Sequence, residues 1–214
     1  MWPPSLAAMS PVVVLVCRVM VALAWLAGST AARATVDVAV SDAAGRPLAG
    51  AAVFVESAAA RAAVRPLAKA EIVQQNRQFV PMVSLVPVGT PVSFPNVDTV
   101  RHHVYSFSPV KRFEIKLYVG TPAQPVVFDQ PGIAALGCNI HDTMAAWVLA
   151  VETPWYGLTD SQGRLRLAAV PTGAHRVRVW HPSLPAGTPA ADLPVTVPAQ
   201  GAAALQVRLA GAGA

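Results

Sequence analysis

Short apolar runs, each bounded by Gly, Pro, Asp or Asn, recur along the chain from Thr35 to Leu209. Some of these runs alternate apolar and polar residues, as in Thr35-Val36-Asp37-Val38-Ala39-Val40. Alternation of this kind is typical of half-buried β-strands, and the Gly and Pro residues between the runs are typical of turns. The sequence lacks the periodicity of a long amphipathic helix. The pattern therefore predicts an all-β protein.

The predicted strands form three blocks. The first block has strands at 35–40 and 51–55, and an Ala- and Arg-rich segment after it, 58–70, is predicted to be a linker or loop. The strands of the middle block are predicted at 79–85, 92–94, 103–107, 113–118, 126–128 and 145–151. The last block is predicted to contain turn-rich strands at 159–167, 175–180, 193–197 and 205–209.

The N-terminus carries the longest apolar stretch, with runs at 12–16 and 19–27 that end in small residues and the triplet Ala32-Arg33-Ala34. This arrangement predicts a secretory signal peptide over residues 1–34, cleaved after Ala34, and hence export to the periplasm. The alternative is an uncleaved membrane anchor, because the stretch approaches the length of a membrane-spanning helix. After cleavage, no segment is expected to span a membrane.

The charge balance narrows the choice of partner. The chain has 16 basic and 11 acidic residues, and loss of Arg18 and Arg33 with the signal peptide would leave a net charge of +3. The sequence lacks a basic cluster interleaved with aromatic residues, so nucleic acid is not expected as a partner. A local group of basic residues is either a solvated surface or a patch that steers an acidic redox partner: Arg101, Lys111, Arg112 and Lys116.

Only one cysteine is expected in the mature protein. The chain has Cys17, within the predicted signal peptide, and Cys138. A single cysteine cannot form an internal disulfide, and an exposed free thiol is a liability in an oxidising compartment. Metal ligation would account for Cys138, and the alternative is a buried, inert cysteine that packs as a small apolar residue.

The residues around Cys138 have the spacing of a metal site. Cys138, His141 and Met144 follow one another as C-x2-H-x2-M, and the pair His102-His103 lies upstream. One thiolate, two imidazoles and a weak axial thioether are the ligands of a mononuclear type 1, or blue, copper site. Adjacent residues of a strand face opposite sides, so only one of His102 and His103 can face such a metal directly.

The middle block, over residues 71–152, resembles the cupredoxin family. The segment Val88-Gly89-Thr90-Pro91-Val92-Ser93-Phe94-Pro95-Asn96-Val97-Asp98 is similar to the family's "G-x-x-V-x-F-x-N-x-D" strand, and the Cys138–Met144 loop is similar to the short ligand loop of plastocyanin- and amicyanin-like members. The strings HHVYSFSP and GCNIHD are also similar to bacterial cupredoxin-like proteins labelled methylamine utilisation proteins. The resemblance implies a Greek-key β-sandwich with one type 1 copper ion.

The resemblance also implies a role for each ligand. Cys138 would supply the thiolate, His141 would be a ligand and the electron exit, and Met144 would be the axial ligand. Aligning His-His-Val on the family's His-Asn-Val makes His102 the preferred upstream ligand, with His103 as the alternate. Asn96 would either pin the Cys138 loop through its backbone or act as a plain turn residue.

The two flanking blocks resemble the carboxypeptidase regulatory-like, or transthyretin-like, sandwich. The resemblance rests on Val38 to Ala51 and on Thr159 to Val179, each of which contains a D-x-x-G turn. It implies that residues 35–60 and 157–210 build one small β-sandwich, with the cupredoxin domain inserted between its two parts.

The predicted function is that of an exported, copper-dependent single-electron carrier that exchanges electrons with a redox partner protein. The sequence has neither a C-x3-C pair for a binuclear centre nor a further cluster of histidines, so an enzyme is not expected. Two alternatives remain: a module that binds, sequesters or delivers copper without electron shuttling, and a β-sandwich binding or scaffold protein whose copper site is vestigial.

Overall fold

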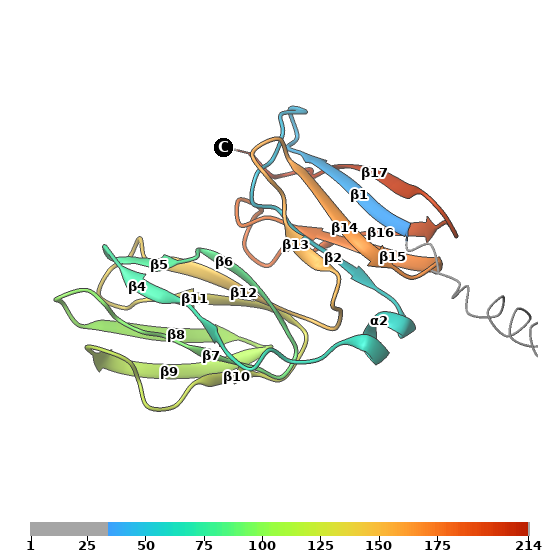
Figure 1. Cartoon of the computed structure of the whole chain (residues 1–214). Coiled ribbons are helices and arrows are strands. Elements are labelled where there is room, and N and C mark those ends of the chain that lie inside the picture. Colours follow the sequence, from blue (N-terminus) through green and yellow to red (C-terminus); the bar gives the residue numbers. More distant parts are fainter. Residues whose placement is uncertain (1–33, 214) are drawn as a thin grey trace, which may run out of the picture. The chain divides into compact units, whose positions relative to one another are not determined.

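The computed structural model describes residues 34–213 (Figure 1). The predicted signal peptide and Cys17 therefore fall outside the described residues, except for Ala34. Ala34 is buried, begins strand β1 (Ala34–Ser41) and lies opposite Val170. Within residues 34–213, no helix has the length and apolar character needed to cross a membrane.

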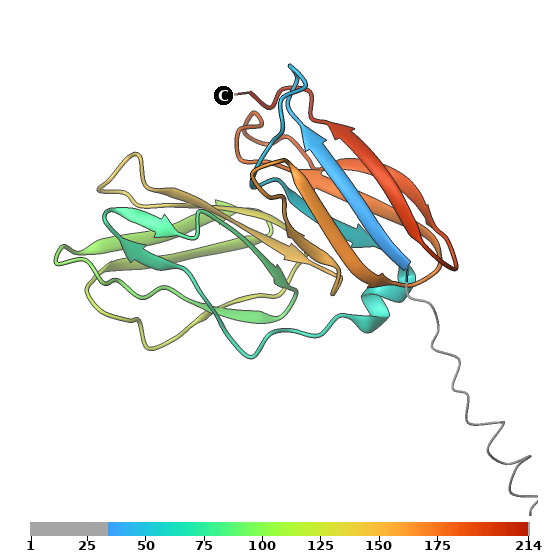
Figure 2. The ribbon, with the colours of Figure 1, turned by 45° about the horizontal axis from the view of Figure 1, so that its top comes forward.

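The first and last blocks pair with each other. One sheet has the order β14 (Arg164–Val170), β1, β17 (Ala202–Arg208), and the other has the order β13 (Tyr156–Leu158), β2 (Ala52–Glu56), β15 (Gly173–Trp180), β16 (Ala191–Val197). The two sheets form separate layers in Figure 2 and share one apolar core. We call this pair of sheets the flanking sandwich.

Side-chain alternation explains how β1 and β2 fit this core. Val36, Val38 and Val40 of β1 are buried, and Asp37 between them faces outward, where it pairs with Arg166 across the sheet. Successive side chains of a strand point to opposite faces, so one face of β1 supplies the core and the other meets solvent. β2 lies between two strands in its sheet and is buried from Ala52 to Val55, on both of its faces.

The middle block forms a second pair of sheets, the middle sandwich. A five-stranded sheet has the order β6 (Val83–Pro87), β12 (Ala145–Val151), β11 (Gly132–Gly137), β8 (His102–Ser108), β9 (Lys111–Tyr118). A three-stranded sheet has the order β10 (Val126–Phe128), β7 (Thr90–Ser93), β3 (Ala70–Glu71). Strands β4 (Val73–Gln75) and β5 (Gln78–Val80) form a separate two-stranded hairpin in the same block.

Strand β12 is apolar along its whole length because both of its faces are covered. Ala146, Val148 and Ala150 belong to the core of the middle sandwich, and Leu149 and Val151 belong to the core that contains the flanking sandwich. A strand buried on both faces needs a continuous apolar run rather than alternation. The run predicted at 145–151 is therefore this strand.

The all-β fold class is confirmed, with one local exception. Residues Ala58–Ala63, predicted to be linker or loop, form the short helix α2. The side chain of Ser57 caps this helix by accepting a hydrogen bond from the backbone N–H of Ala60, and alanine has the highest helix propensity. The linker prediction is wrong for these six residues because the serine cap and the run of alanines favour a helix.

Candidate metal centre

The Cys138 loop is held at both ends by one pair of strands. Cys138 follows the last residue of β11, and Met144 precedes the first residue of β12. Gly137 lies opposite Ala145 in the antiparallel pairing of these strands, so the two ends of the loop are adjacent. Within the loop, the backbone N–H of Met144 donates to the carbonyl of His141 at 2.9 Å. The pairing therefore places Cys138, His141 and Met144 on one short turn.

His102 meets this loop from the neighbouring strand. Strand β8 pairs with β11. His102 is the first residue of β8 and is fully buried. Ligand atoms of His102, Cys138 and His141 all lie within 4.8 Å of one another. The Sγ of Cys138 is 3.7 Å from Nδ1 of His141, and the two imidazole rings are 4.9 Å apart between centroids. These three side chains form a compact nitrogen–nitrogen–sulfur cluster.

The imidazole of His102 has one nitrogen engaged and one free. Its Nε2 hydrogen-bonds the Asp98 carboxylate at 2.7 Å. Its Nδ1 is buried and has no hydrogen-bond partner among the described residues. A buried polar atom without a partner is costly, and metal ligation would satisfy it. The bond to Asp98 favours a proton on Nε2, which leaves the lone pair of Nδ1 available for a metal.

Asp98 is itself fixed by a tight turn. The backbone N–H groups of Asn76 and Arg77, between β4 and β5, donate to its two carboxylate oxygens at 2.7 and 2.9 Å. Both turn residues have left-handed backbones, with φ of 53° and 55°. The Arg77 backbone N–H, and after it the His102 ring, hold the pKa of Asp98 below its usual value. A carboxylate behind a ligating histidine orients the ring and raises its basicity.

His103 lies on the other side of strand β8. Its Nε2 hydrogen-bonds Glu114 at 2.9 Å, and its ring lies 5.6 Å from that of Tyr105. Its Nδ1 also lacks a partner among the described residues, but His103 does not belong to the cluster with Cys138. The two adjacent histidines therefore occupy different environments, as strand alternation requires.

Met144 and Asn96 complete the surroundings of the cluster. Met144 is 1% exposed and shares an apolar core with Cys138. The amide of Asn96 donates to the carbonyls of Val100 and Tyr118, and its oxygen accepts from the N–H of Asp98. These bonds fix the segment before His102, whereas the expected bonds to the Cys138 loop are not among them.

Tyr118 lies opposite His102 in the pairing of β8 with β9. Its hydroxyl donates to the carbonyl of Phe94 at 2.6 Å and also contacts the side-chain amide of Gln74. Burial raises the pKa of Tyr118 to about 12. The phenol therefore stays neutral and keeps its hydrogen bond throughout the physiological pH range.

Sequence reasoning did not assign a role to Asp98. The motif that contains it was recognised, but its contacts come from a turn about twenty residues upstream and from a ring on β8. Its position four residues before His102 was the one available signal. By contrast, Asp142, on the Cys138 loop itself, is exposed.

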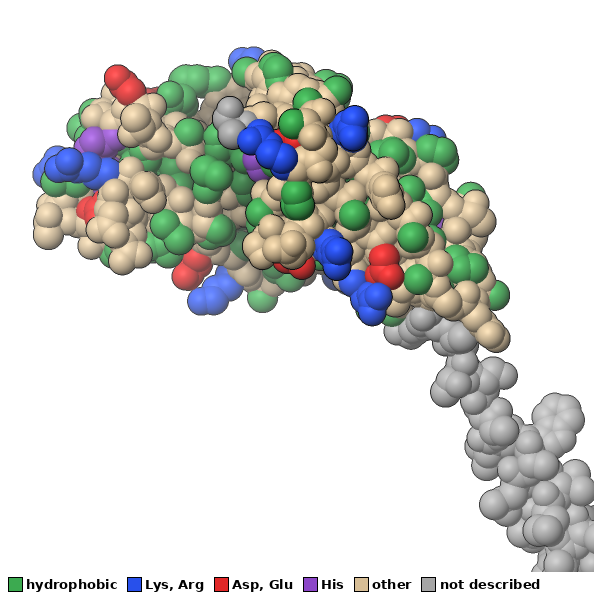
Figure 3. Space-filling model, turned by 90° about the horizontal axis from the view of Figure 1, so that it is seen from above, with side chains coloured by type: hydrophobic (Ala, Val, Ile, Leu, Met, Phe, Trp, Pro, Cys, Tyr) green, Lys and Arg blue, Asp and Glu red, His purple; other side chains and the backbone are tan. Residues whose placement is uncertain are grey.

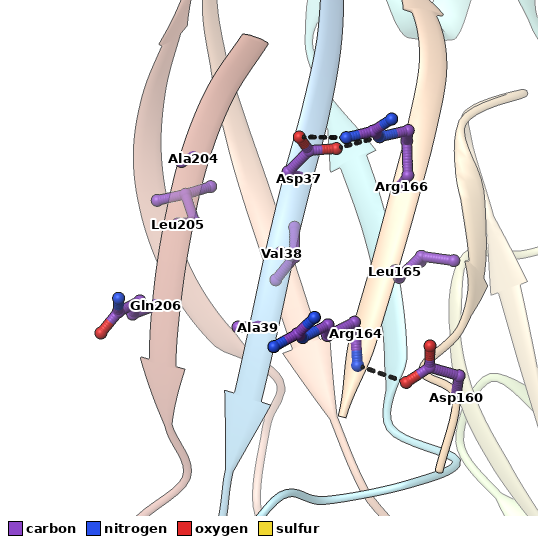
Figure 4. Close-up of a pocket in the computed structure, with 10 residues that line it drawn as sticks. All are labelled: Asp37, Val38, Ala39, Asp160, Arg164, Leu165, Arg166, Ala204, Leu205 and Gln206. Carbon is purple, nitrogen blue, oxygen red and sulfur yellow. Dashed lines mark hydrogen bonds and ion pairs between the residues drawn. The ribbon is translucent and has the colours of Figure 1, made fainter. Parts of the chain in front are cut away.

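The structure has a further hollow, of about 440 Å³, on the flanking sandwich (Figure 4). Its walls come from β1, β14 and β17 and include none of the cluster residues. Asp37 and Arg166 pair with each other there, through two hydrogen bonds at 2.7 and 3.0 Å, and the Asp160 carboxylate accepts from the backbone N–H groups of Gln162 and Arg164. On the face shown in Figure 3, lysine and arginine side chains are dispersed over the surface.

No protein-family model matches the chain, and no curated protein matches it. Solved structures with similarity include a novel purple cupredoxin from Nitrosopumilus maritimus, at 22% identity over 38% of this chain and 99% of that chain, with a TM-score of 0.35. A copper-containing nitrite reductase from Thermus scotoductus is 23% identical over 41% of this chain and 23% of that chain, with a TM-score of 0.37.

A mutant of amicyanin in its reduced Cu(I) form is 17% identical over 46% of this chain and 98% of that chain, with a TM-score of 0.36. Each of these similarities covers less than half of the chain. The chemistry of the cluster is therefore argued from its own residues and the distances between them.

Proposed function

We propose that this chain is an exported type 1 copper protein that carries single electrons. The observation that carries the proposal is the convergence of His102, Cys138 and His141 within 4.8 Å, with Nδ1 of His102 buried and unpartnered among the described residues. Export follows from the sequence of residues 1–34, and the destination is the periplasm.

The donor set suits copper. Thiolate and imidazole together bind both Cu(I) and Cu(II), and a weak thioether completes the type 1 set. Cys138 would supply the thiolate, Nδ1 of His102 and a nitrogen of His141 the imidazoles, and Met144 the thioether sulfur. Bound copper would supply the one-electron couple between Cu(II) and Cu(I).

The protein itself would hold the ligands rigidly and leave one of them accessible to a redox partner. His102, Cys138 and Met144 are buried, and the paired strands β8, β11 and β12 hold them in place. Buried ligands on paired strands move little, and the surrounding core keeps water out. His141 is partly exposed, whereas His102 and Cys138 are buried, so His141 would be the electron exit of the cluster.

We propose a carrier rather than an enzyme, since His102, Cys138 and His141 would all be occupied as ligands of the metal. The partner would be another redox protein. The flanking sandwich would be a carboxypeptidase regulatory-like module that supports the copper domain between its two parts. Copper sequestration or delivery without electron shuttling is the second candidate.

Addition of Cu(II) to the metal-free protein tests this function. We expect one equivalent of copper to produce an intense visible absorption from thiolate-to-copper charge transfer, and ascorbate to bleach it reversibly. Binding of Cu(I) alone, without colour, would support sequestration or delivery instead. Absence of stoichiometric binding would leave only a scaffold role.

Single replacements of the two adjacent histidines test the upstream ligand. We expect His102→Ala to lose the intense visible band, because it removes a buried ligand nitrogen. His103→Ala should keep the band, because the His103 ring is engaged with Glu114 on the other side of the strand. Absorption titration with Cu(II) measures both variants. Equal loss in the two would contradict the assignment.

The Asp98 carboxylate is expected to strengthen metal binding through His102. Asp98→Asn keeps the side-chain shape but removes the charge behind the Nε2 proton, so copper affinity should fall about 10- to 100-fold. Competition with a chelator of known copper affinity measures the change. Asp142→Asn is the matched control, since Asp142 is exposed on the loop itself. Similar losses in both variants would show that loop charge, rather than Asp98, governs affinity.

A further inference from the structure

A row of aromatic rings runs along one face of strand β8. The ring of Tyr105 lies 5.6 Å from that of His103 and 5.0 Å from that of Phe107, measured between centroids. Exposure increases along the row, from 3% at His103 to 70% at Phe107. A large aromatic side chain that is mostly exposed is unusual in a chain that otherwise buries its phenylalanines, and such residues mark contact surfaces.

The middle ring of this row also touches the backbone next to the cluster. Tyr105 lies opposite Gly137, the residue before Cys138, in the pairing of β8 with β11. A Cβ atom at position 137 would lie 2.7 Å from both Cζ and Oη of Tyr105, a distance that real contacts do not reach. The phenol ring therefore occupies the space above Gly137, one residue from the thiolate.

Cationic side chains lie beside the exposed end of the row. Arg112 of β9 is directly opposite Phe107, and Lys116 is exposed on the same strand. Glu114 lies between them, opposite Tyr105, and its carboxylate is hydrogen-bonded to the His103 ring. The face thus combines an exposed ring with two cations that have no carboxylate partner among the described residues. Such a surface is complementary to an anionic partner.

We propose that this outer face of β8 and β9 docks an acidic one-electron partner protein, and that Tyr105 links the docked partner to Cys138. The proposal rests on the proposed copper function. Copper held at the cluster would supply the electron by passing from Cu(I) to Cu(II), and the partner would gain that electron. No covalent bond forms or breaks. Tyr105 is a positioning residue: its ring fills the space between the docked partner and the backbone next to Cys138, and the electron would cross there.

The docking step is tested on the metal-free protein with hexacyanochromate(III), a redox-inert paramagnetic anion. We expect it to broaden the NMR signals of the backbone amides of β8 and β9. The double variant Arg112→Gln and Lys116→Gln should lose this broadening. The matched control, Arg61→Gln and Arg164→Gln, removes two exposed cations elsewhere and should keep it. Uniform broadening over the whole surface, or broadening confined to the 138–144 loop, would overturn the docking site.

The transfer step is tested on the copper-loaded protein by stopped-flow oxidation. Tyr105→Leu should slow oxidation by hexacyanoferrate(III) several-fold, while the visible spectrum and the rate with cationic tris(phenanthroline)cobalt(III) stay unchanged. Phe107→Leu, at an exposed position that does not endanger folding, should slow the anionic probe in the same way. Unchanged rates with a normal spectrum would overturn this inference alone. A protein that binds no copper would overturn the proposed function as well.

Discussion

Cys138→Ser is expected to remove the intense visible absorption of the copper-loaded protein completely. The serine hydroxyl has nearly the shape of the thiol, but it does not ionise near neutral pH and is a hard donor that copper does not select. The two histidines could still bind Cu(II), with lower affinity and without the thiolate charge-transfer band. Titration of wild type and variant with Cu(II), followed by visible absorption and by copper content, measures the loss.

Two further measurements make the Cys138→Ser result specific. Cys138 is 4% exposed in an apolar core, so the hydroxyl should also cost about 1–3 kcal/mol of unfolding free energy in the metal-free protein. Met144→Leu is the matched control, because it changes the axial ligand, which tunes the potential, and leaves the thiolate in place. Retention of the band by Cys138→Ser, or its loss in both variants, would refute a thiolate–copper centre.

Gly163→Ala is expected to destabilise the flanking sandwich by at least about 3 kcal/mol. Gly163 has a left-handed backbone, with φ of +68°, and a Cβ there would lie 2.3 Å from the carbonyl oxygen of Val40 and 2.9 Å from the amide nitrogen of Leu48. These backbone atoms are themselves hydrogen-bonded to each other at 3.0 Å. They cannot move aside without breaking this hydrogen bond, which holds the turn between β1 and β2.

Gly50→Ala is the control for this prediction. Gly50 has nearly the same backbone conformation, with φ of +73°, and a Cβ there would meet nothing within 4 Å. It should therefore cost only the left-handed strain, about 1–2 kcal/mol. Denaturant unfolding of both variants gives the two free energies, and their difference isolates the steric clash. Equal losses would show that the backbone near Val40 adjusts freely.

Some elements were predictable because they depend on local pattern. The apolar run at 145–151 coincides with β12, and the alternating run at 35–40 lies within β1. β11 was not predicted, because Gly132-Ile133-Ala134-Ala135-Leu136-Gly137 is made largely of small residues with weak strand preference. Its pairing with β8 and β12, rather than its own composition, makes it a strand.

Part of the candidate site was likewise predictable from local sequence, and part depends on strand pairing. The spacing of Cys138, His141 and Met144 gave the kinds of ligand and put them on one loop, since residues so close in sequence stay close in space. Strand alternation predicted that His102 and His103 face opposite sides. Which of the two meets the loop depends on the pairing of β8 with β11, and hence on contacts between residues about 35 positions apart.

By itself, the sequence determined the all-β class, the short loop with its thiolate and thioether, and the presence of one unpaired cysteine after position 34, because these follow from composition and local spacing. The tertiary structure decided that His102 joins that loop, that Asp98 holds the His102 ring, and that Tyr105 covers Gly137. Each of these contacts joins separate strands or turns, and only the register of the folded sheet brings them within bonding distance.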